Sequence, residues 1–160
     1  MPVVELFREH HLELVRLAAM VAGDLAVAED VVQDVYERLH RRPPVLRDDA
    51  ASLAYARASV LNGCRTAYRQ AAARRRHAAI LLESTEAVPD TAAAAADRGV
   101  LVAALRELPR RQREVLVLHY YCDLDVAEIA AMLRIGRSTV RSTMSRGLAA
   151  LAQAVREGDR

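Results

Sequence analysis

The stretch from Leu124 to Leu151, LDVAEIAAMLRIGRSTVRSTMSRGLAAL, constrains the fold more than any other part of the chain. Asp125 is a suitable N-cap, and the carboxylate of Glu128, three residues later, can accept a hydrogen bond from the backbone N–H of that cap. The helix that starts there ends at Arg134-Ile135-Gly136, where we expect Gly136 to adopt the left-handed conformation of a tight turn. The stretch therefore predicts two short helices joined by a turn.

The second helix of this pair has two chemically different sides. One side is an apolar stripe at helical spacing, which we expect to face the first helix, and it consists of Val140, Met144, Leu148 and Leu151. The other side carries arginines and short hydroxyl side chains without any acidic residue. Side chains of these kinds contact base edges and phosphates in DNA grooves. The pattern favours a DNA-reading helix over the alternative, an ordinary helical hairpin with a solvated basic face.

Composition indicates an all-α protein whose length of 160 residues allows one domain or two small ones. Half of the chain (52%) is hydrophobic, yet it has one phenylalanine and no tryptophan, so the core depends on Leu, Val, Ala and Met. That mixture favours helices over strands. Cys64 and Cys122 lack metal-binding spacing and are expected to be reduced apolar fillers. Neither a signal-peptide pattern nor an apolar run of membrane-spanning length is visible, so we expect a cytoplasmic protein without membrane insertion.

The first half of the chain predicts three helices. Apolar residues recur at helical spacing over residues 4–21 and 26–40, with Gly23 ending the first helix and Asp24 capping the second. Pro43-Pro44 end the second helix, and a third is expected over residues 50–76. The helix over residues 26–40 combines an apolar stripe with an exposed acidic and polar face.

Charge is distributed unevenly along these helices. Residues 1–50 carry ten acids and six arginines, whereas residues 51–80 carry six arginines and no acid. The basic side of the third helix, with tyrosines interleaved, suits a nucleic-acid backbone and an unpaired base. The alternative is a solvated helix whose arginines balance the acidic first half, and charge alone leaves both interpretations open. An acidic surface followed by a basic helix suggests two different partners.

The character of the sequence changes between residues 77 and 99, where Val88-Pro89-Asp90 precede an alanine-rich run. We interpret residues 81–98 as a flexible linker between a first domain, residues 1–80, and a second domain, residues 99–155. The second domain should begin with helices over residues 99–108 and 110–122, before the helix pair described above.

The sequence contains nothing on which catalysis could be built. The five histidines fall on separate elements without a second ligand at useful spacing, and no phosphate loop, nucleophile elbow or HExxH motif occurs. We therefore expect a protein that is not an enzyme, without catalytic residues, metal site, cofactor or small-molecule substrate.

Two separate stretches resemble one family. The segment Ala28–Tyr36, AEDVVQDVY, resembles the DxxQ(E/D)xF segment with which bacterial sigma factors bind the clamp helices of RNA polymerase. The segment Leu105–Pro109, LRELP, followed by Arg113-Glu114-Val115 and the helix pair, resembles their C-terminal domain. Over residues 5–76 and 100–152 the chain resembles an extracytoplasmic-function (group 4) sigma factor of the sigma-70 family, which has only the second and fourth sigma domains.

This resemblance implies an all-α fold of two small helical domains, the second ending in a helix-turn-helix. It implies a sigma factor that binds core RNA polymerase and directs transcription initiation at specific promoters. Core polymerase and promoter DNA are then the partners, and an anti-sigma factor is a further partner that the family allows.

The resemblance also implies roles for individual residues. Polymerase would be bound by Asp30, Gln33, Asp34 and Arg38. The melted strand of the downstream (−10) promoter element would be held by Tyr55, Asn62, Arg65, Arg69, Arg74, Arg75 and Arg76. The upstream (−35) element would be read in the major groove by Arg137, Ser138, Thr139, Arg141, Ser142, Ser145 and Arg146. The loop Pro43–Asp49 corresponds to the loop that captures a flipped base in the family.

Three positions depart from the family pattern. Asp34 replaces the commoner glutamate and keeps its charge with a shorter reach. Thr143 stands where relatives often carry a basic residue, so we expect one phosphate contact to be missing. Gly147, inside the second helix of the pair, costs about 1 kcal/mol relative to alanine unless close packing requires it.

Two other functions stay open from the residues alone. A stand-alone helix-turn-helix regulator would bind duplex operators as a dimer, but no dimerisation heptad or ligand pocket is evident. A decoy that titrates an anti-sigma factor without binding DNA would have no use for the arginines of the second helix.

Overall fold

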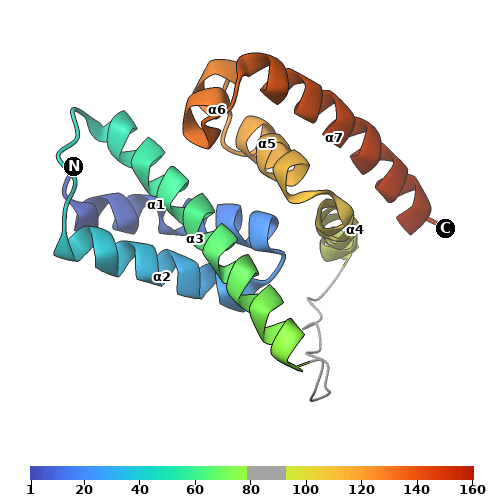
Figure 1. The fold of residues 1–160 in the computed structure, drawn as a ribbon, viewed down its shortest axis with the longest axis horizontal. Coiled ribbons are helices and arrows are strands. Elements are labelled where there is room, and N and C mark those ends of the chain that lie inside the picture. The colour runs from blue at the N-terminus through green and yellow to red at the C-terminus, as the bar shows by residue number, and fades with distance from the viewer. Residues whose placement is uncertain (79–92) are drawn as a thin grey trace.

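The computed structural model describes residues 1–78 and 93–160, with the side chains of residues 75, 77, 78 and 93–98 left out of the description. Helices alone make up the regular structure of these ranges (Figure 1), which confirms the all-α fold class. The helices are α1 (Val3–Ala22), α2 (Leu25–Arg41), α3 (Asp49–Ala78), α4 (Ala93–Glu107), α5 (Arg110–Tyr120), α6 (Val126–Leu133) and α7 (Arg137–Gly158).

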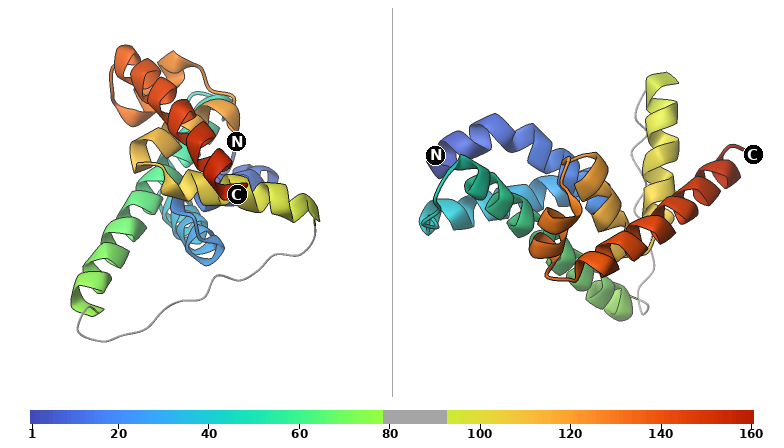
Figure 2. Two further views of the ribbon diagram at one scale, coloured as in Figure 1. Left: turned by 90° about the vertical axis from the view of Figure 1, so that its right-hand side faces the viewer. Right: turned by 90° about the horizontal axis from the view of Figure 1, so that it is seen from above.

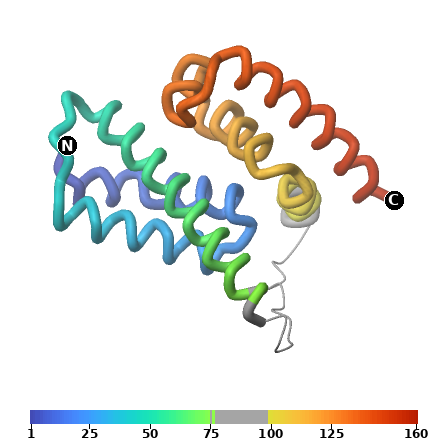
Figure 3. Tube along the Cα trace, viewed as in Figure 1, coloured from blue at the N-terminus to red at the C-terminus, as the bar shows by residue number. Residues whose placement is uncertain are grey.

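The first domain consists of α1, α2 and α3, which pack against one another. α3 runs diagonally across α1 and α2 (Figure 3). Gly23 ends α1 in the left-handed conformation with φ 74°, and the Asp24 carboxylate accepts a hydrogen bond of 3.1 Å from the Val27 backbone N–H at the start of α2. Both predicted helix signals are therefore confirmed. The largest fully buried side chains here are Leu14, Leu17, Val32, Val35, Val60 and Leu61.

The second domain is arranged around α7, which packs against α4, α5 and α6. The predicted capping box at the start of α6 is confirmed: Asp125 Oδ1 accepts from the Glu128 N–H, and Glu128 Oε2 accepts from the Asp125 N–H, both at 2.8 Å. Ile129 and Val140 are completely buried between α6 and its neighbours. The helix-turn-helix is thus present as predicted.

The turn between α6 and α7 is built differently from the prediction. Arg134, not Gly136, takes the left-handed conformation, with φ 55° and ψ 48°. Its backbone N–H and that of Ile135 both donate to the Ala130 carbonyl, which closes the end of α6. Gly136 is extended and serves as the N-cap of α7. The left-handed residue had to come earlier because the partly buried Ile135 must return to the core immediately after α6 ends.

The buried face of α7 also differs from the predicted apolar stripe. Val140 is buried and Met144 and Leu151 are half-buried, but Leu148 is 40% exposed, so its inclusion in the stripe was wrong. Thr143 and Gly147 are buried in its place. A Cβ atom on Gly147 would lie 3.2 Å from Leu116 Cδ1 and 3.3 Å from Gln112 Cβ. The close approach of α5 therefore explains why a glycine stands at this position. It also explains why the buried face of α7 includes Thr143 and Gly147 rather than Leu148.

Helix α4 begins at Ala93, inside the stretch predicted as a linker. Alanine has the highest intrinsic helix propensity, which accounts for the early start. The rest of the predicted linker, residues 81–92, lies outside the described residues, and the domain bounds stay a prediction.

The two domains share one continuous apolar core. α1 contacts α4 and α5, and α3 contacts α6. Val115, Leu118 and Cys122 of the second domain cluster with the buried residues of the first. Both cysteines are buried free thiols, as predicted. α7 runs away from the first domain towards the C-terminus (Figure 2), so α4, α5 and α6 make most of the contact between the domains. None of the helices in the described ranges is long and apolar enough to cross a membrane.

Candidate nucleic-acid interface

The exposed side of α7 is polar and basic from Arg137 to Arg146. All seven residues predicted to read the upstream element are exposed on it, namely Arg137, Ser138, Thr139, Arg141, Ser142, Ser145 and Arg146. We call this set the α7 surface. The Ser142 hydroxyl donates to the Thr139 carbonyl at 3.1 Å, and Arg146 Nε donates to the Ser142 carbonyl at 3.3 Å. The guanidinium groups of Arg137 and Arg141 make no hydrogen bond with another described residue, so they are available to a ligand.

Thr143 does not belong to this surface. It is only 4% exposed and faces the domain interior. The buried Thr143 side chain cannot itself contact a phosphate outside the domain, and the expectation of a missing contact at this position stays a prediction.

The basic side of α3 is less uniform. Tyr55, Asn62, Arg69, Arg74 and Arg76 are exposed, whereas the side chain of Arg75 lies outside the described part of the chain. Arg65 is the exception among the predicted strand-holding residues, because its side chain is only 19% exposed. Its Nη1 donates to Asn62 Oδ1 at 3.2 Å, and its other donors are directed at the second domain. We call the predicted set on α3 the α3 surface.

The partner of Arg65 is Glu114 of α5, whose side chain is completely buried. Arg65 Nε and Nη2 donate to Glu114 Oε1 and Oε2 at 2.9 and 3.1 Å, and Arg111 Nη1 donates to Oε2 at 3.1 Å. Arg110 Nε lies 3.9 Å from Oε1. The hydrogen bonds to Glu114 raise the pKa of Arg65. A buried carboxylate is stable only when cations and donors surround it in this way.

Sequence reasoning missed the role of Glu114. Forty-nine residues separate it from Arg65, so no helical spacing can connect them. Its one local signal is its position immediately before the apolar run Val115–Leu118, which places it on a helix buried over most of its surface.

The neighbouring Arg113 binds four backbone carbonyls. It donates to those of Leu105, Arg106 and Leu108 at the end of α4, at 2.8, 3.0 and 3.1 Å. It also donates to the Val21 carbonyl in the last turn of α1 at 2.6 Å. Carbonyls at helix C-termini lack partners inside their own helix and attract cations. Burial lowers the pKa of Arg113. Two consecutive residues of α5 thus bind the first domain: Arg113 binds α1, and Glu114 binds α3.

The residues predicted to bind polymerase lie on the outward face of α2. Asp30, Gln33, Asp34 and Arg38 are all exposed. Gln33 Nε2 donates to Glu37 Oε1 at 3.2 Å, and Glu37 in turn accepts from Arg41 at 3.1 Å. Asp30 and Asp34 form no ion pair with another described residue, so both carboxylates face solvent uncompensated.

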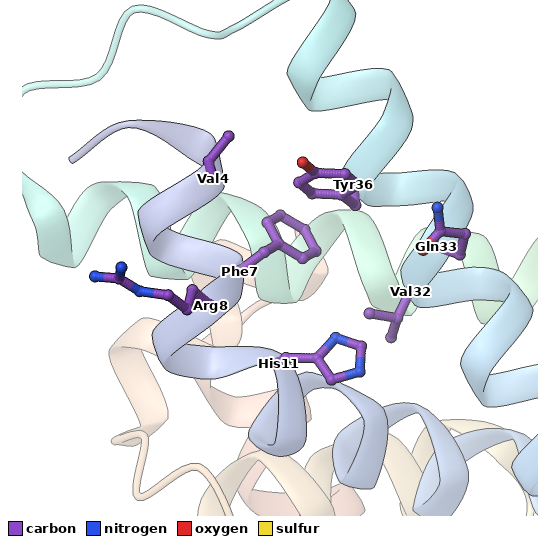
Figure 4. A pocket seen from close by; sticks show the side chains of 7 residues that line it. All are labelled: Val4, Phe7, Arg8, His11, Val32, Gln33 and Tyr36. Carbon is purple, nitrogen blue, oxygen red and sulfur yellow. The ribbon is translucent and has the colours of Figure 1, made fainter.

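A shallow groove between α1 and α2 adjoins this face (Figure 4). Val4, Phe7, Arg8 and His11 of α1 and Val32, Gln33 and Tyr36 of α2 line it. The rings of Phe7 and Tyr36 pack edge to face, with centroids 5.2 Å apart and planes at 65°. Gln33 belongs both to the groove and to the acidic-polar face, so an apolar surface continues directly into a charged one.

An exposed acidic helix face, a basic helix and a docked helix-turn-helix are the arrangement expected of a DNA-binding protein of transcription. Comparison with known families agrees. The family model described as Sigma-70 region 2 matches residues 6–74, and the one described as Sigma-70, region 4 matches residues 98–151.

Individual relatives extend the match over most of the chain. The ECF RNA polymerase sigma factor SigM of Mycobacterium tuberculosis is 33% identical over 149 residues, which cover 93% of this chain and 74% of SigM. SigL of the same species is 32% identical over 158 residues, covering 95% of this chain and 88% of SigL. The chain therefore belongs to the extracytoplasmic-function sigma factors of the sigma-70 family. It is a sigma factor that directs transcription initiation, and sigma factors are regulators of transcription rather than enzymes.

A solved structure shares the fold. The sigma factor RpoE of Bartonella quintana, in complex with the anti-sigma factor NepR, superposes with a TM-score of 0.79 at 19% sequence identity. The superposition covers 93% of this chain and 95% of RpoE.

Proposed function

We propose that this sigma factor divides its work among three helices: α2 binds core RNA polymerase, α3 holds the melted −10 strand, and α7 reads the −35 element. The observation that carries the proposal is the composition of the α7 surface. All seven predicted reading residues are exposed together, while the opposite side of the same helix is buried.

The α7 surface has the geometry that a recognition helix needs. Arg137 and Arg141 lie one helical turn apart near its start, where a helix enters the major groove. The first turn of α7 has no side-chain cap, because Gly136 occupies the cap position. Its free backbone N–H groups are therefore available to a DNA phosphate.

The α2 face supports a protein partner rather than DNA. Its two uncompensated carboxylates, Asp30 and Asp34, would repel a phosphate backbone and attract a basic protein surface. The adjoining groove with Phe7 and Tyr36 offers apolar area beside these charges. Protein interfaces commonly combine an apolar centre with a charged rim.

The α3 surface suits a single strand. Tyr55 is 44% exposed and can stack on an unpaired base, while Arg69, Arg74 and Arg76 extend the basic side along the helix. Salt-dependent phosphate contacts of this kind give affinity without sequence preference, so sequence choice would fall to the α7 surface and to the loop Pro43–Asp49.

We place this activity in the cytoplasm, where transcription takes place, and we include an anti-sigma factor among the partners. The similarity to RpoE supports a shared fold for such an interaction, and no residue of this chain is assigned to it.

Reconstitution tests the proposal. Purified chain is added to sigma-free core polymerase, and run-off transcription is measured on promoters obtained by sequencing the DNA that the two proteins bind together. We expect binding to core and initiation from a defined start site. A chain that binds duplex DNA tightly as a dimer without polymerase would instead be a stand-alone regulator, and a chain that neither binds core nor initiates contradicts the proposal.

A further inference from the structure

One residue of the α3 surface has an observed contact that competes with its proposed role. Arg65 is predicted to hold DNA, yet two of its guanidinium nitrogens donate to the buried Glu114 carboxylate. The third donates to Asn62, another residue of the same surface. While Glu114 occupies this guanidinium, a DNA phosphate cannot make the bidentate contact.

The pair joins the two domains at a largely buried site. Glu114 is 0% exposed and Arg65 19% exposed, so the attraction between them is screened far less than that of a surface pair. Arg113, the residue next to Glu114, donates to the Val21 carbonyl of α1 on the other side of α5. The second domain is therefore bound at two points of the first, through neighbouring residues.

Apolar contacts accompany these bonds between the domains. Val115, Leu118 and Cys122 are buried in the core shared with α1–α3. Separation of the domains would expose this surface together with Glu114. A partner that binds the separated domains would have to offset that exposure. In the proposed function, core polymerase binds α2 of the first domain, and the promoter that it holds binds α3 and α7.

We propose that the Arg65–Glu114 pair is a latch that holds the free chain closed and withholds Arg65 from the melted strand until the second domain moves away. The role of Arg65 towards DNA rests on the proposed function, whereas the closure does not. The latch lowers the affinity of the free chain for single-stranded DNA without affecting the exposed α7 surface.

Cys122 is a native reporter of this closure. Its thiol is 7% exposed, burial raises its pKa to about 11, and Arg57 of α3 and Glu13 of α1 are the charges that act on it. It therefore faces the first domain and should react only when the domains separate. Cys64 packs inside the first domain, where its Sγ donates to the Ala18 carbonyl, and Glu114 and Arg65 are the charges that act on it. It serves as the control for unfolding when the rates are compared at equal thiolate fraction, which the pH dependence of each rate gives.

The test is alkylation of the full-length chain with N-ethylmaleimide, followed by peptide mass spectrometry. We expect Glu114→Gln and Arg65→Gln each to accelerate alkylation of Cys122 about tenfold or more by favouring the open state, with Cys64 unchanged. Arg69→Gln removes the same charge one turn further along α3 and should leave both rates as in the wild type. An unchanged Cys122 rate in both latch variants would overturn the latch.

Global unfolding and the DNA role are separated by two further measurements. If the Cys64 rate rises with that of Cys122 in Glu114→Gln, the variant has unfolded, and the less buried substitution Arg65→Gln then tests the latch. Anisotropy with a fluorescent single-stranded oligo(dT) probe should show tighter binding to Glu114→Gln than to wild type, by about tenfold. Faster Cys122 alkylation with unchanged oligo(dT) binding would support the latch and remove Arg65 from the proposed DNA surface.

Discussion

The two candidate DNA surfaces of this protein differ in how they are held. The α7 surface is fully exposed, its polar contacts are short-range within one helix, and its back is packed into its own domain. The α3 surface is interrupted at Arg65, which the other domain binds through Glu114. In the proposal, the α7 surface is accessible in the free chain, whereas access to the whole α3 surface depends on where the second domain lies.

On this proposal, the two domains can pack against each other in the free chain, and the protein can still function as a subunit of RNA polymerase. A surface that reads duplex DNA can stay open, because duplex promoters are always present. A surface for melted DNA has a ligand only after polymerase has opened the promoter. Covering part of that surface in the free chain therefore prevents no binding step.

Asp34→Arg should abolish promoter binding through both DNA surfaces, because both act only in the complex with core polymerase. The substitution reverses one of two uncompensated charges on the proposed polymerase-binding face, and placing like charges together at an interface costs several kcal/mol. We expect loss of co-purification with core polymerase and of run-off transcription, with an unchanged circular dichroism spectrum. The matched control is Glu9→Arg on α1, an equally exposed charge reversal away from the proposed face. Retained core binding in Asp34→Arg would rule out α2 as the docking helix.

Arg141→Ala should affect the α7 surface alone. A bidentate arginine contact to a base contributes about 1–3 kcal/mol of discrimination, so the preference for the cognate −35 sequence should fall by that amount. Transcription from a panel of −35 variants measures it, and melting of the −10 region should not change. Arg156→Ala, exposed near the end of the same helix, is the control. If the preference across the panel is the same as in the wild type, α7 does not read this position.

Gly147→Val should disturb the packing of α7 on α5, on the side of α7 opposite the α7 surface. The first added carbon would meet Leu116 and Gln112 at 3.2 and 3.3 Å, and overpacking of this kind destabilises by about 1–3 kcal/mol. Urea denaturation followed by circular dichroism gives the change in the free energy of unfolding. Ala149→Val introduces the same side chain on the exposed side of α7 and should cost only a few tenths of a kcal/mol. Equal effects of the two substitutions would show that α5 does not press on Gly147.

Asp125→Ala should have the smallest effect. It removes the side chain that accepts from the Glu128 N–H at the start of α6, and loss of such a cap costs about 1 kcal/mol. The expected fall in melting temperature is about 2–4 °C. Asp125→Asn keeps an acceptor at the cap and should melt close to the wild type; a fall as large as that of alanine would show that the cap is not the cause.

Sequence reasoning succeeded where the determining contacts are local. The caps at Asp24 and Asp125, the stop at Gly23 and the polar side of α7 all depend on residues within a few positions of one another. The left-handed turn residue and the burial of Leu148 were mispredicted, because both depend on how α6 and α7 pack on their neighbours.

The pairing of Arg65 with Glu114 could not be predicted at all. A positive face on α3 can be recognised from its sequence, but which of its charges is already neutralised depends on a residue 49 positions away. The same limit applies to Gly147. Its cost in helix propensity can be predicted from the sequence, but its contact with α5 cannot.

The most direct test of the account is footprinting of the reconstituted polymerase on one promoter, with hydroxyl radicals to map protection and permanganate to detect unpaired thymines. We predict protection of the −35 element and reactive thymines in the −10 element with wild-type chain. Asp34→Arg should abolish both signals, whereas Arg141→Ala should weaken only the −35 protection. Undiminished −35 protection in Arg141→Ala, or no reactive thymines with the wild type, would contradict the assignment of two promoter elements to two surfaces of this chain.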